Sequence, residues 1–526
     1  MKRFITSILS IIAFSIPICA QVLNQEMMNY EPVGRNLLNQ RQIIAFKQTF
    51  DVPVQHAEFD SVTNTVLLTL KEEANKKDEK MVDPGIRYAV YFDLEQNELK
   101  WRKEFYRYEE VYIKSRAMVF KVKGDDFFLV DEATGDEQFK IGSGMWPVYF
   151  DTEEGWMICM TGMNGLGSRR TLCKIDLKMK SKIWERDVWS AQEFKMSTKL
   201  NDSTLLFVGN GLYSVNINNG RGWRLETNMQ EVSSDNRKGS GLYYYSIYNF
   251  GSRFSVRVCS NPCVDGSNIY IAGSKRLIKA DVNGKEQWHT SLPERKTSYS
   301  RLFATSDHLL MVNMGYASHT LRFFTFNDKW GAPFLAAYDK KTGENVYMHE
   351  CKKNVDYIKD VEFRNDDDAL FLLLEDNKGH FSVEKYWVNS GVLVYSMEIA
   401  PMMVQSLGKL NAFVGSDVCV RTDGRFVPLS EKDSIGVYVI CDNGVLHLDN
   451  DLKRTMDFLA FNELFVYRGK FGGLRFYSHG KETVVVDNEN REVATLDFPK
   501  VFCSESKLYS IKDKSLYVIS KEQLSD

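Results

Sequence analysis

Short apolar runs alternate along the chain with turns that are rich in Asp, Asn and Gly. The runs contain many β-branched and aromatic residues, which is typical of strands. Beyond residue 20, no segment keeps the period of about 3.6 residues that marks an amphipathic helix. Asn210-Gly211 and Asn443-Gly444 each stand between apolar runs, and Asn-Gly favours the tight turn of a β-hairpin. The pattern therefore predicts an all-β chain.

The runs recur as one unit: two apolar strands, an Asp, a turn that ends in Gly, and then an aromatic residue. The motif is clearest in three copies, which are Asp131, Gly135 and Phe139; Asp281, Gly284 and Trp288; and Asp339, Gly343 and Tyr347. The Asp side chain can hold the turn, the Gly supplies a backbone conformation that other residues resist, and the aromatic residue buries a large area. We therefore expect these residues to join neighbouring units rather than to form a site.

The second strand of the unit can be placed ten times along the chain. The ten segments are 65–70, 117–122, 156–161, 204–208, 268–272, 308–314, 369–374, 437–441, 474–478 and 507–511. Such a repeat predicts an array, and β-propellers usually have up to about eight blades. We therefore expect one β-propeller of four-stranded antiparallel blades over residues 21–526, with about eight blades. A larger ring and two separate propellers are the alternatives.

The last of these units lacks a fourth strand. The segment 41–50, with Ile43, Ile44 and Phe46, precedes the first unit and has no sheet of its own. We expect it to supply the missing strand and to close the ring. Closure would remove two exposed sheet edges, which otherwise invite aggregation.

The repeat resembles the quinoprotein-type, or PQQ-like, β-propeller repeat, whose signature is Ala-x-Asp, a Thr-Gly turn and a docking Trp. Ala337, Asp339, Thr342 and Gly343 match this signature, with Tyr347 in the position of the Trp. The resemblance implies the propeller fold and aromatic contacts between blades. Quinone-dependent members of the family carry two adjacent cysteines, and no two cysteines are adjacent here. The resemblance therefore implies a member without redox catalysis.

Residues 1–20 have the composition of a signal peptide: Lys2 and Arg3, then an apolar run at 4–18, then Ala20. We expect cleavage before Gln21 and export to the periplasm, the cell surface or the medium. Acylation at Cys19 is the alternative. No later apolar run is long enough to span a membrane. The net charge is −3 and no long basic block occurs, which argues against a nucleic-acid partner.

Motifs that would indicate catalysis are absent. The chain has no His-Glu-x-x-His zinc motif, no Gly-x-Ser-x-Gly nucleophile turn and no phosphate-binding Gly-rich loop. We therefore predict no catalytic residues, no metal and no cofactor. Nine cysteines are present. Cys159 and Cys173 are placed to face each other across a hairpin, and Cys259 and Cys263 are close in sequence. The favoured interpretation is nevertheless that most of the cysteines are buried free thiols.

Three long insertions provide the candidate binding residues. They lie at 71–86, 226–254 and 315–333, between the second and third strands of a unit or between two units. Since the strands are antiparallel, all these connections emerge on one face. The candidate binding residues, which we call the aromatic patch, are Tyr243, Tyr244, Tyr245, Tyr248, Phe323, Phe324 and Trp330. Alternatively, each insertion folds into an extra hairpin and buries its own aromatic residues.

Together these features predict an exported, non-catalytic scaffold that binds a protein of the cell envelope through the aromatic patch. A glycan-binding or glycan-active protein that uses the same patch is the alternative, because aromatic rings also stack on sugars. A quinone- or metal-dependent enzyme is the third class. The partner and the oligomeric state do not follow from the sequence.

Overall fold

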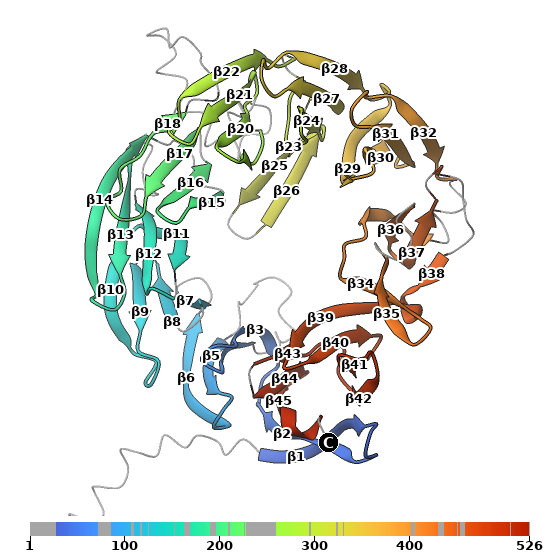
Figure 1. Cartoon of the computed structure of the whole chain (residues 1–526). Coiled ribbons are helices and arrows are strands. Elements are labelled where there is room, and N and C mark those ends of the chain that lie inside the picture. Colours follow the sequence, from blue (N-terminus) through green and yellow to red (C-terminus); the bar gives the residue numbers. More distant parts are fainter. Residues whose placement is uncertain are drawn as a thin grey trace, which may run out of the picture. The chain divides into compact units, whose positions relative to one another are not determined.

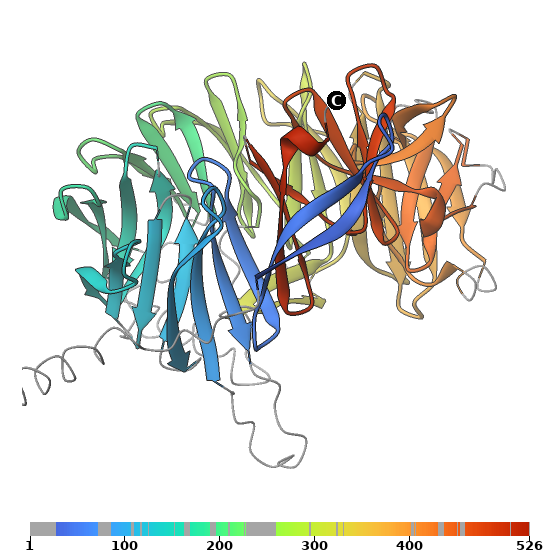
Figure 2. The same ribbon diagram turned by 90° about the horizontal axis from the view of Figure 1, so that it is seen from below.

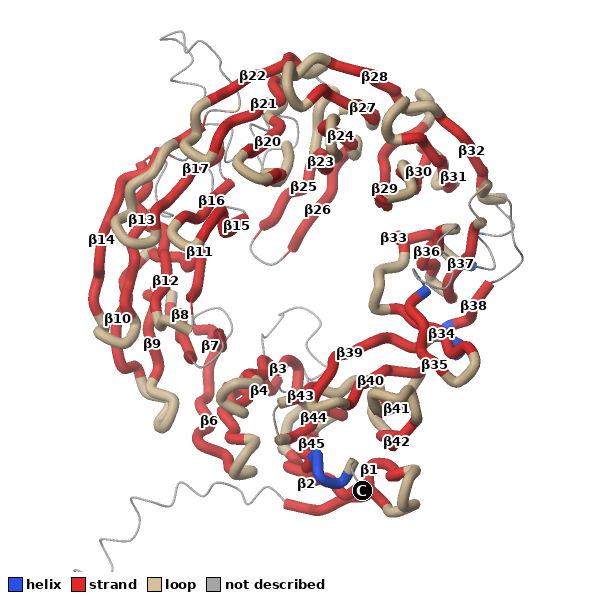
Figure 3. The backbone as a smooth tube through the Cα atoms, in the orientation of Figure 1, coloured by secondary structure: helices blue, strands red, loops and turns tan. Residues whose placement is uncertain are grey.

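A computed structural model describes residues 28–524 apart from internal gaps. The gaps are 72–85, 107–109, 116–117, 125, 152, 162–168, 190–195, 209–210, 226, 228–258, 294–295, 322–323, 330, 365, 401–403, 405–406, 430–435, 450, 453–457 and 505. Figure 3 shows that the described chain is made largely of strands. Two short 3-10 turns are described, η3 (Phe461–Glu463) and η4 (Lys521–Gln523). The predicted all-β class is confirmed.

The chain divides into two compact units. Unit 1 comprises Met1–Gly124, Leu129–Gln138 and Val466–Asp526, and unit 2 comprises Asp125–Phe128 and Phe139–Phe465. The boundary between the units falls within the third and fourth strands of the second sheet, β9 and β10.

Unit 1 begins with two antiparallel sheets, in the orders β3-β4-β5-β6 and β10-β9-β8-β7. Their strands are β3 (Val54–Asp60), β4 (Thr65–Lys71), β5 (Ile86–Asp93), β6 (Glu98–Tyr106), β7 (Glu110–Ser115), β8 (Met118–Lys123), β9 (Asp126–Val130) and β10 (Glu137–Ser143). A longer sheet of unit 1 contains both ends of the described chain, in the order β39-β40-β41-β42-β1-β2-β45-β44-β43. Its strands are β1 (Met28–Asn36), β2 (Gln42–Thr49), β39 (Phe465–Phe471), β40 (Leu474–His479), β41 (Glu482–Val486), β42 (Glu492–Leu496), β43 (Phe502–Cys503), β44 (Lys507–Lys512) and β45 (Ser515–Ser520).

The N-terminal strands lie beside the C-terminal strand in this long sheet. In the pairing of β2 with β45, Phe46 is opposite Val518 and Gln48 is opposite Leu516. Figure 2 shows the blue β1–β2 hairpin against the red C-terminal strands. The strand at 42–49 therefore stands fourth after β43, β44 and β45.

Strand β1 has no counterpart among the sequence predictions. It pairs with β2 on one side and with β42 on the other, and its pairing with β2 is irregular between Pro32 and Gly34. Its sequence is polar and contains Pro, which is typical of an edge or of a loop. The partners on both sides, rather than its own pattern, hold it in the sheet.

Unit 2 continues with consecutive four-stranded antiparallel sheets (Figure 1). The first three sheets are β11 (Met145–Asp151), β12 (Trp156–Thr161), β13 (Arg169–Asp176) and β14 (Ser181–Trp189); β15 (Met196–Asn201), β16 (Thr204–Val208), β17 (Leu212–Asn216) and β18 (Arg224–Leu225); and β19 (Cys263–Asp265), β20 (Asn268–Ala272), β21 (Arg276–Asp281) and β22 (Glu286–Ser291). The next three sheets are β23 (Ser300–Ala304), β24 (His308–Asn313), β27 (Phe334–Asp339) and β28 (Asn345–Glu350); β29 (Val355–Arg364), β30 (Ala369–Asp376), β31 (Phe381–Trp387) and β32 (Leu393–Glu398); and β33 (Leu410–Phe413), β36 (Val437–Cys441), β37 (Gly444–Leu448) and β38 (Phe458–Ala460). Two hairpins interrupt these sheets, β25 (Tyr316–Leu321) with β26 (Phe324–Lys329), and β34 (Val418–Thr422) with β35 (Arg425–Pro428).

These sheets define the fold class. Among the described residues, eight four-stranded sheets are separate, and two more sets of four strands lie within the long sheet of unit 1. All ten predicted second strands coincide with observed strands to within about two residues at each end. Consecutive four-stranded antiparallel sheets that pack on one another are the blades of a β-propeller.

The core lies between successive blades. In unit 2, apolar residues of β24 and β27 pack on those of β29, β30 and β31, and the other face of β30 and β31 packs on β33, β36 and β37. In unit 1, β44 and β45 pack in the same way on β4 and β5. Because both faces of the middle strands are covered, their sequences are nearly continuous apolar runs.

Trp288 and Tyr347, which the motif predicts as docking residues, reach the turn of the next blade. The Trp288 indole Nε1 donates to the carbonyl oxygen of Lys340 at 3.1 Å. Gly343 in that turn has a φ of +77°, and a Cβ built there would lie 2.6 Å from the Trp288 ring. The same indole or hydroxyl contact recurs for Trp101 on Glu132, Trp184 on Ile217, Trp223 on Val282 and Tyr347 on Val388. Phe139 carries no polar atom for this bond.

Candidate functional site

The hairpin β25–β26 is the best-described insertion. Strands β24 and β27 pair with each other, with Asn313 opposite Phe334, and the chain leaves the blade after Asn313 to form the hairpin. The hairpin therefore extends from the end of a complete four-stranded blade (Figure 1). The connection predicted at 315–333 is thus an extra hairpin in its described part.

One buried amide fixes the root of this hairpin. The Asn313 side chain is 0% exposed, and its Oδ1 accepts from the Ser298 backbone N–H at 2.6 Å and from the Ser300 hydroxyl at 3.1 Å. Its Nδ2 donates to the carbonyl oxygens of Lys296 at 3.0 Å and Ala332 at 2.6 Å. A buried amide whose donors and acceptor are all used holds its surroundings in one arrangement. Asn313 therefore ties the segment before β23 to the chain that returns from the hairpin.

The chain re-enters the blade through a left-handed turn. Gly331 has a φ of +76°, and a Cβ on it would lie 2.1 Å from the carbonyl oxygen of Lys296. Ala332 follows, and its N–H donates to the same oxygen at 3.0 Å. Only glycine fits this close approach.

Three half-buried tyrosines lie beside the root, and we call them the tyrosine cluster: Tyr299, Tyr316 and Tyr357. The Tyr299 and Tyr316 rings are stacked, with centroids 5.7 Å apart. Tyr357, from the next blade, meets Tyr316 edge to face at 6.4 Å. Burial raises the pKa of Tyr316 and of Tyr357, so both hydroxyls are neutral at ordinary pH. The cluster offers aromatic faces with polar tips, a combination enriched at interfaces.

Ion pairs frame the tyrosine cluster and connect three blades. Asp356 pairs with Lys329 at the end of β26. The Asp360 carboxylate accepts from Arg301 of the preceding blade at 2.8 Å and from the Phe413 N–H of the following blade at 2.9 Å. The inner strands β23, β29 and β33 are therefore held together beside the cluster.

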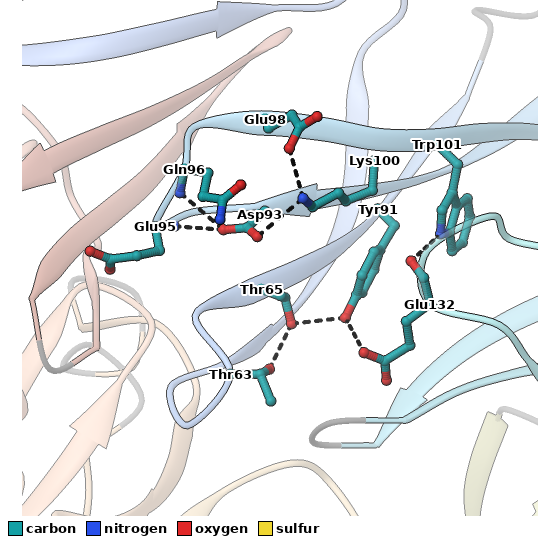
Figure 4. A network of polar contacts seen from close by, with 10 residues as sticks. All are labelled: Thr63, Thr65, Tyr91, Asp93, Glu95, Gln96, Glu98, Lys100, Trp101 and Glu132. Atoms are coloured by element: carbon teal, nitrogen blue, oxygen red, sulfur yellow. Dashed lines mark hydrogen bonds and ion pairs between the residues drawn. The ribbon is translucent and has the colours of Figure 1, made fainter.

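A second group of polar residues lies between two blades of unit 1 (Figure 4). The Tyr91 hydroxyl is 2.9 Å from Glu132 Oε2 and 3.1 Å from Thr65 Oγ1, and Lys114 Nζ is 3.4 Å from the same hydroxyl. Desolvation lowers the pKa of Lys114 and raises the pKa values of Glu132 and Tyr91. Perturbed groups of this kind can mark an active site. Here Tyr91 is 2% exposed and Lys114 is 8% exposed, so the group is covered from solvent and joins two blades.

A cavity of about 460 Å³ opens in unit 1 between the β40–β41 turn and the end of β44. Its lining is polar and consists of His479, Gly480, Lys481, Glu482, Asp497 and Lys512. No Phe, Tyr or Trp side chain is among them. The cavity therefore lacks the ring surface on which a sugar would stack.

Most of the predicted aromatic patch falls outside the described residues. Tyr243, Tyr244, Tyr245, Tyr248, Phe323 and Trp330 lie there. Phe324 is the first residue of β26, where its backbone is opposite Leu321. The structure therefore does not test the patch, and the patch stays a prediction.

Sequence reasoning did not find Asn313, Tyr299 and Tyr357. Tyr299 directly precedes the inner strand β23, and Tyr357 lies near the start of the inner strand β29. Both residues lie outside the long insertions, which supplied all the predicted binding residues. The available signal was positional: an inner strand begins on the same face as the insertions. Asn313 ends an apolar strand directly before an insertion. An asparagine at this position can form hydrogen bonds with the chain on both sides of the insertion, so its place in the sequence is a usable signal.

Two further observations concern the described residues. They contain no group of three or more His, Cys, Asp or Glu side chains arranged to hold a metal ion. Over the same part of the chain, no helix combines the length and the apolar character needed to cross a membrane.

Comparison with known proteins gives similarity at the level of fold. No protein-family model matches the chain, and no curated protein matches it. Among solved structures, BamB from Moraxella catarrhalis is 10% identical with a TM-score of 0.28, over 78% of this chain and 96% of BamB. A eukaryotic initiation factor is 9% identical with a TM-score of 0.36, over 71% and 96%, and the C-terminal WD40 domain of Sif2 is 11% identical with a TM-score of 0.30, over 70% and 92%. With likeness this low, the assignment to the β-propeller class rests on the sheets described above.

Proposed function

We propose that this protein is an exported, non-catalytic β-propeller that binds a protein of the cell envelope through the face that carries the β25–β26 hairpin. The proposal rests mainly on the base of this hairpin, where hydrogen bonds of the Asn313 side chain fix the chain beside the tyrosine cluster. Loops and hairpins on a rigid scaffold are where propellers commonly place binding residues.

The propeller is further proposed to be of the PQQ-like type. The support is the Asp-Thr-Gly turn: Asp339 Oδ1 accepts from the N–H groups of Lys341 and Thr342, both at 2.8 Å, and Gly343 lies under the Trp288 ring. Export is proposed from the composition of residues 1–20. A cut before Gln21 and an unmodified N-terminus are expected on sequencing of the mature protein.

The aromatic patch is proposed to extend the binding surface of the tyrosine cluster. Tyr and Trp are enriched among the residues that dominate binding energies at protein interfaces. Phe324 begins the second strand of the hairpin rooted at Asn313. A partner that covers the hairpin would therefore be in reach of both groups of aromatic residues.

Glycan binding is the second candidate, and one observation favours it. Tyr299 and Tyr316 present stacked, half-buried rings at the root of the hairpin, and aromatic faces can also receive a sugar. A glycan ligand would need few charged contacts, whereas a protein partner would also engage the rim formed by Lys329 and Asp356.

The test compares the double variant Tyr299→Ala, Tyr357→Ala with wild-type protein. Partners captured by each from envelope extract are quantified by mass spectrometry, and both are applied to a glycan array. Tyr467→Ala, which removes an exposed tyrosine of unit 1, is the matched control. We expect a specific protein partner to be lost with the double variant and kept with the control. Unchanged capture by a folded double variant would contradict the proposal, and loss of a glycan signal instead would favour the second candidate.

A further inference from the structure

Two cysteines lie directly opposite each other on neighbouring strands. In the antiparallel pairing of β12 with β13, Cys159 is the register partner of Cys173. Residues opposite each other in such a pair point to the same face, and their Cα atoms are about 4.5–5.5 Å apart. A disulfide accepts Cα separations of about 4.4–6.8 Å. The backbone therefore already has the spacing of a cross-strand disulfide.

The two thiols also contact each other away from solvent. Both side chains are 0% exposed, and both are free thiols in the structure. The hydrogen bond between them raises the pKa of Cys159 and lowers the pKa of Cys173. The two sulfurs are therefore close enough to hydrogen-bond to each other.

The other strand cysteines with a described partner lack this arrangement. Cys441 is opposite Gly444, Cys419 is opposite Pro428, and Cys263 is opposite Tyr270. Burial alone, which Cys441 shares, does not place a second sulfur within reach. Cys159 and Cys173 thus differ from these three cysteines because each has the other as its register partner.

We propose that Cys159 and Cys173 form a disulfide that staples β12 to β13 when the chain folds under oxidising conditions. The thiolate of either cysteine attacks the disulfide bond of a small-molecule or protein disulfide, which forms a mixed disulfide and releases one oxidant sulfur as a thiol. The thiolate of the other cysteine then attacks the protein sulfur of the mixed disulfide, so that the Cys159–Cys173 bond forms and the second oxidant sulfur leaves as a thiol. In sum, two protein thiols become one disulfide, and one oxidant disulfide becomes two thiols.

The order of events follows from burial. Since both sulfurs are fully covered in the fold, the oxidant reaches them while the β12–β13 hairpin is forming and before the neighbouring sheet covers that face. Only the cellular occurrence of the bond rests on the proposed export. The chemistry itself can be followed with purified protein, independently of where the protein resides.

The test is refolding of the full chain in a buffer of reduced and oxidised glutathione, followed by alkylation and tryptic digestion. Cleavage after Lys140, Arg169, Arg170 and Lys174 places Cys159 in peptide 141–169 and Cys173 in peptide 171–174. We expect these peptides to be joined, with a mass lower than their sum by the two hydrogen atoms lost. If refolded protein instead yields both cysteines fully alkylated after denaturation, as Cys441 should be, the proposal is overturned.

A second measurement uses the melting temperature of the oxidised protein with and without dithiothreitol. A disulfide stabilises by restricting the unfolded chain, so we expect the reductant to lower the melting temperature of the wild type by several degrees. Cys159→Ser and Cys173→Ser should each lose this dependence, and the matched control Cys441→Ser should keep it. The same dependence in all three variants would also overturn the proposal. N-terminal sequencing of the mature protein tests export separately.

Discussion

At the scale of residues, the recurrent interaction is an aromatic ring on the glycine of the next blade's turn. Trp288 covers Gly343 and bonds the Lys340 carbonyl oxygen. The sequence predicted this role because the motif is local: the Asp, the Gly and the aromatic residue stand close together in one unit. It missed Trp223, which covers Gly284 in the same way, because the turn before Trp223 carries Asn216 in place of Asp.

Replacement of Trp288 by Ala should lower the free energy of unfolding by about 3 kcal/mol, the lower end of the range for aromatic truncations, because the ring is only half-buried. Thermal and denaturant unfolding measure the effect. Val346→Ala, on an exposed position of the neighbouring outer strand, is the control and should change little. A wild-type melting temperature for the Trp288 variant would contradict the assigned register of the repeat.

The buried polar group of unit 1 should make the stability of the protein depend on pH. Desolvation raises the pKa of Glu132 above its ordinary value of 4.5 in the folded protein. Above pH 4.5 the folded state therefore binds more protons than the unfolded state. The stabilising contribution of protonated Glu132 is complete below pH 4.5 and is lost as the pH rises through the pKa of Glu132 in the folded protein. Wild type should thus lose stability relative to Glu132→Gln between acidic and neutral pH. Denaturant unfolding at both values measures this, with Glu98→Gln as the exposed control, and a free energy of unfolding of the wild type that rises with pH relative to that of Glu132→Gln would contradict it.

At the scale of elements, the repeat predicted the positions of the second strands, whereas contacts between segments far apart in the sequence were predicted only in part. All ten second strands follow from apolar runs bounded by turn residues, which are local signals. The sequence predicts the hairpin β25–β26 only as an alternative. Aromatic residues in an insertion are compatible both with binding a ligand and with packing inside an extra hairpin. The tyrosine cluster could not be predicted, since Tyr299 and Tyr357 meet only through the packing of two blades.

Deletion of residues 21–50 should destabilise unit 1. It removes β1 and β2, and therefore exposes the edges of β42 and β45, which invites aggregation. Size-exclusion chromatography and thermal unfolding measure the effect. Deletion of residues 21–27 alone leaves both strands and should behave as wild type. Wild-type stability of the longer deletion would mean that β2 contributes nothing to the C-terminal set of strands.

Replacement of Asn313 by Ala should loosen the root of the hairpin. It leaves the Ala332 carbonyl oxygen and the Ser298 N–H without this partner and removes one of the two hydrogen bonds to the Lys296 carbonyl oxygen, and each unsatisfied buried group costs about 1–3 kcal/mol. Hydrogen exchange should rise at Ser298 and Ala332 and stay unchanged in unit 1. Asn411→Ala, at an exposed asparagine of β33, is the control. Unchanged exchange at the root would show that the amide does not anchor the hairpin.

At the scale of the whole molecule, a chain of four-stranded sheets gives a β-propeller scaffold in two compact units. The sequence predicted this class from the repeat alone, whereas the division into two units depends on contacts between distant parts of the chain and has no local signal. The described residues hold a rigid face around the hairpin root and no metal-binding group. This arrangement suits a surface that binds through aromatic side chains.

The central claim is that binding uses the aromatic patch on this face. The most direct measurement is the affinity of the double variant Tyr244→Ala, Trp330→Ala for the captured envelope partner, compared with wild type, with circular dichroism to verify the fold. We expect an affinity at least tenfold lower, about 1.4 kcal/mol, in a variant that melts like the wild type. Equal binding by wild type and double variant, both to the captured partner and on a glycan array, would contradict the account.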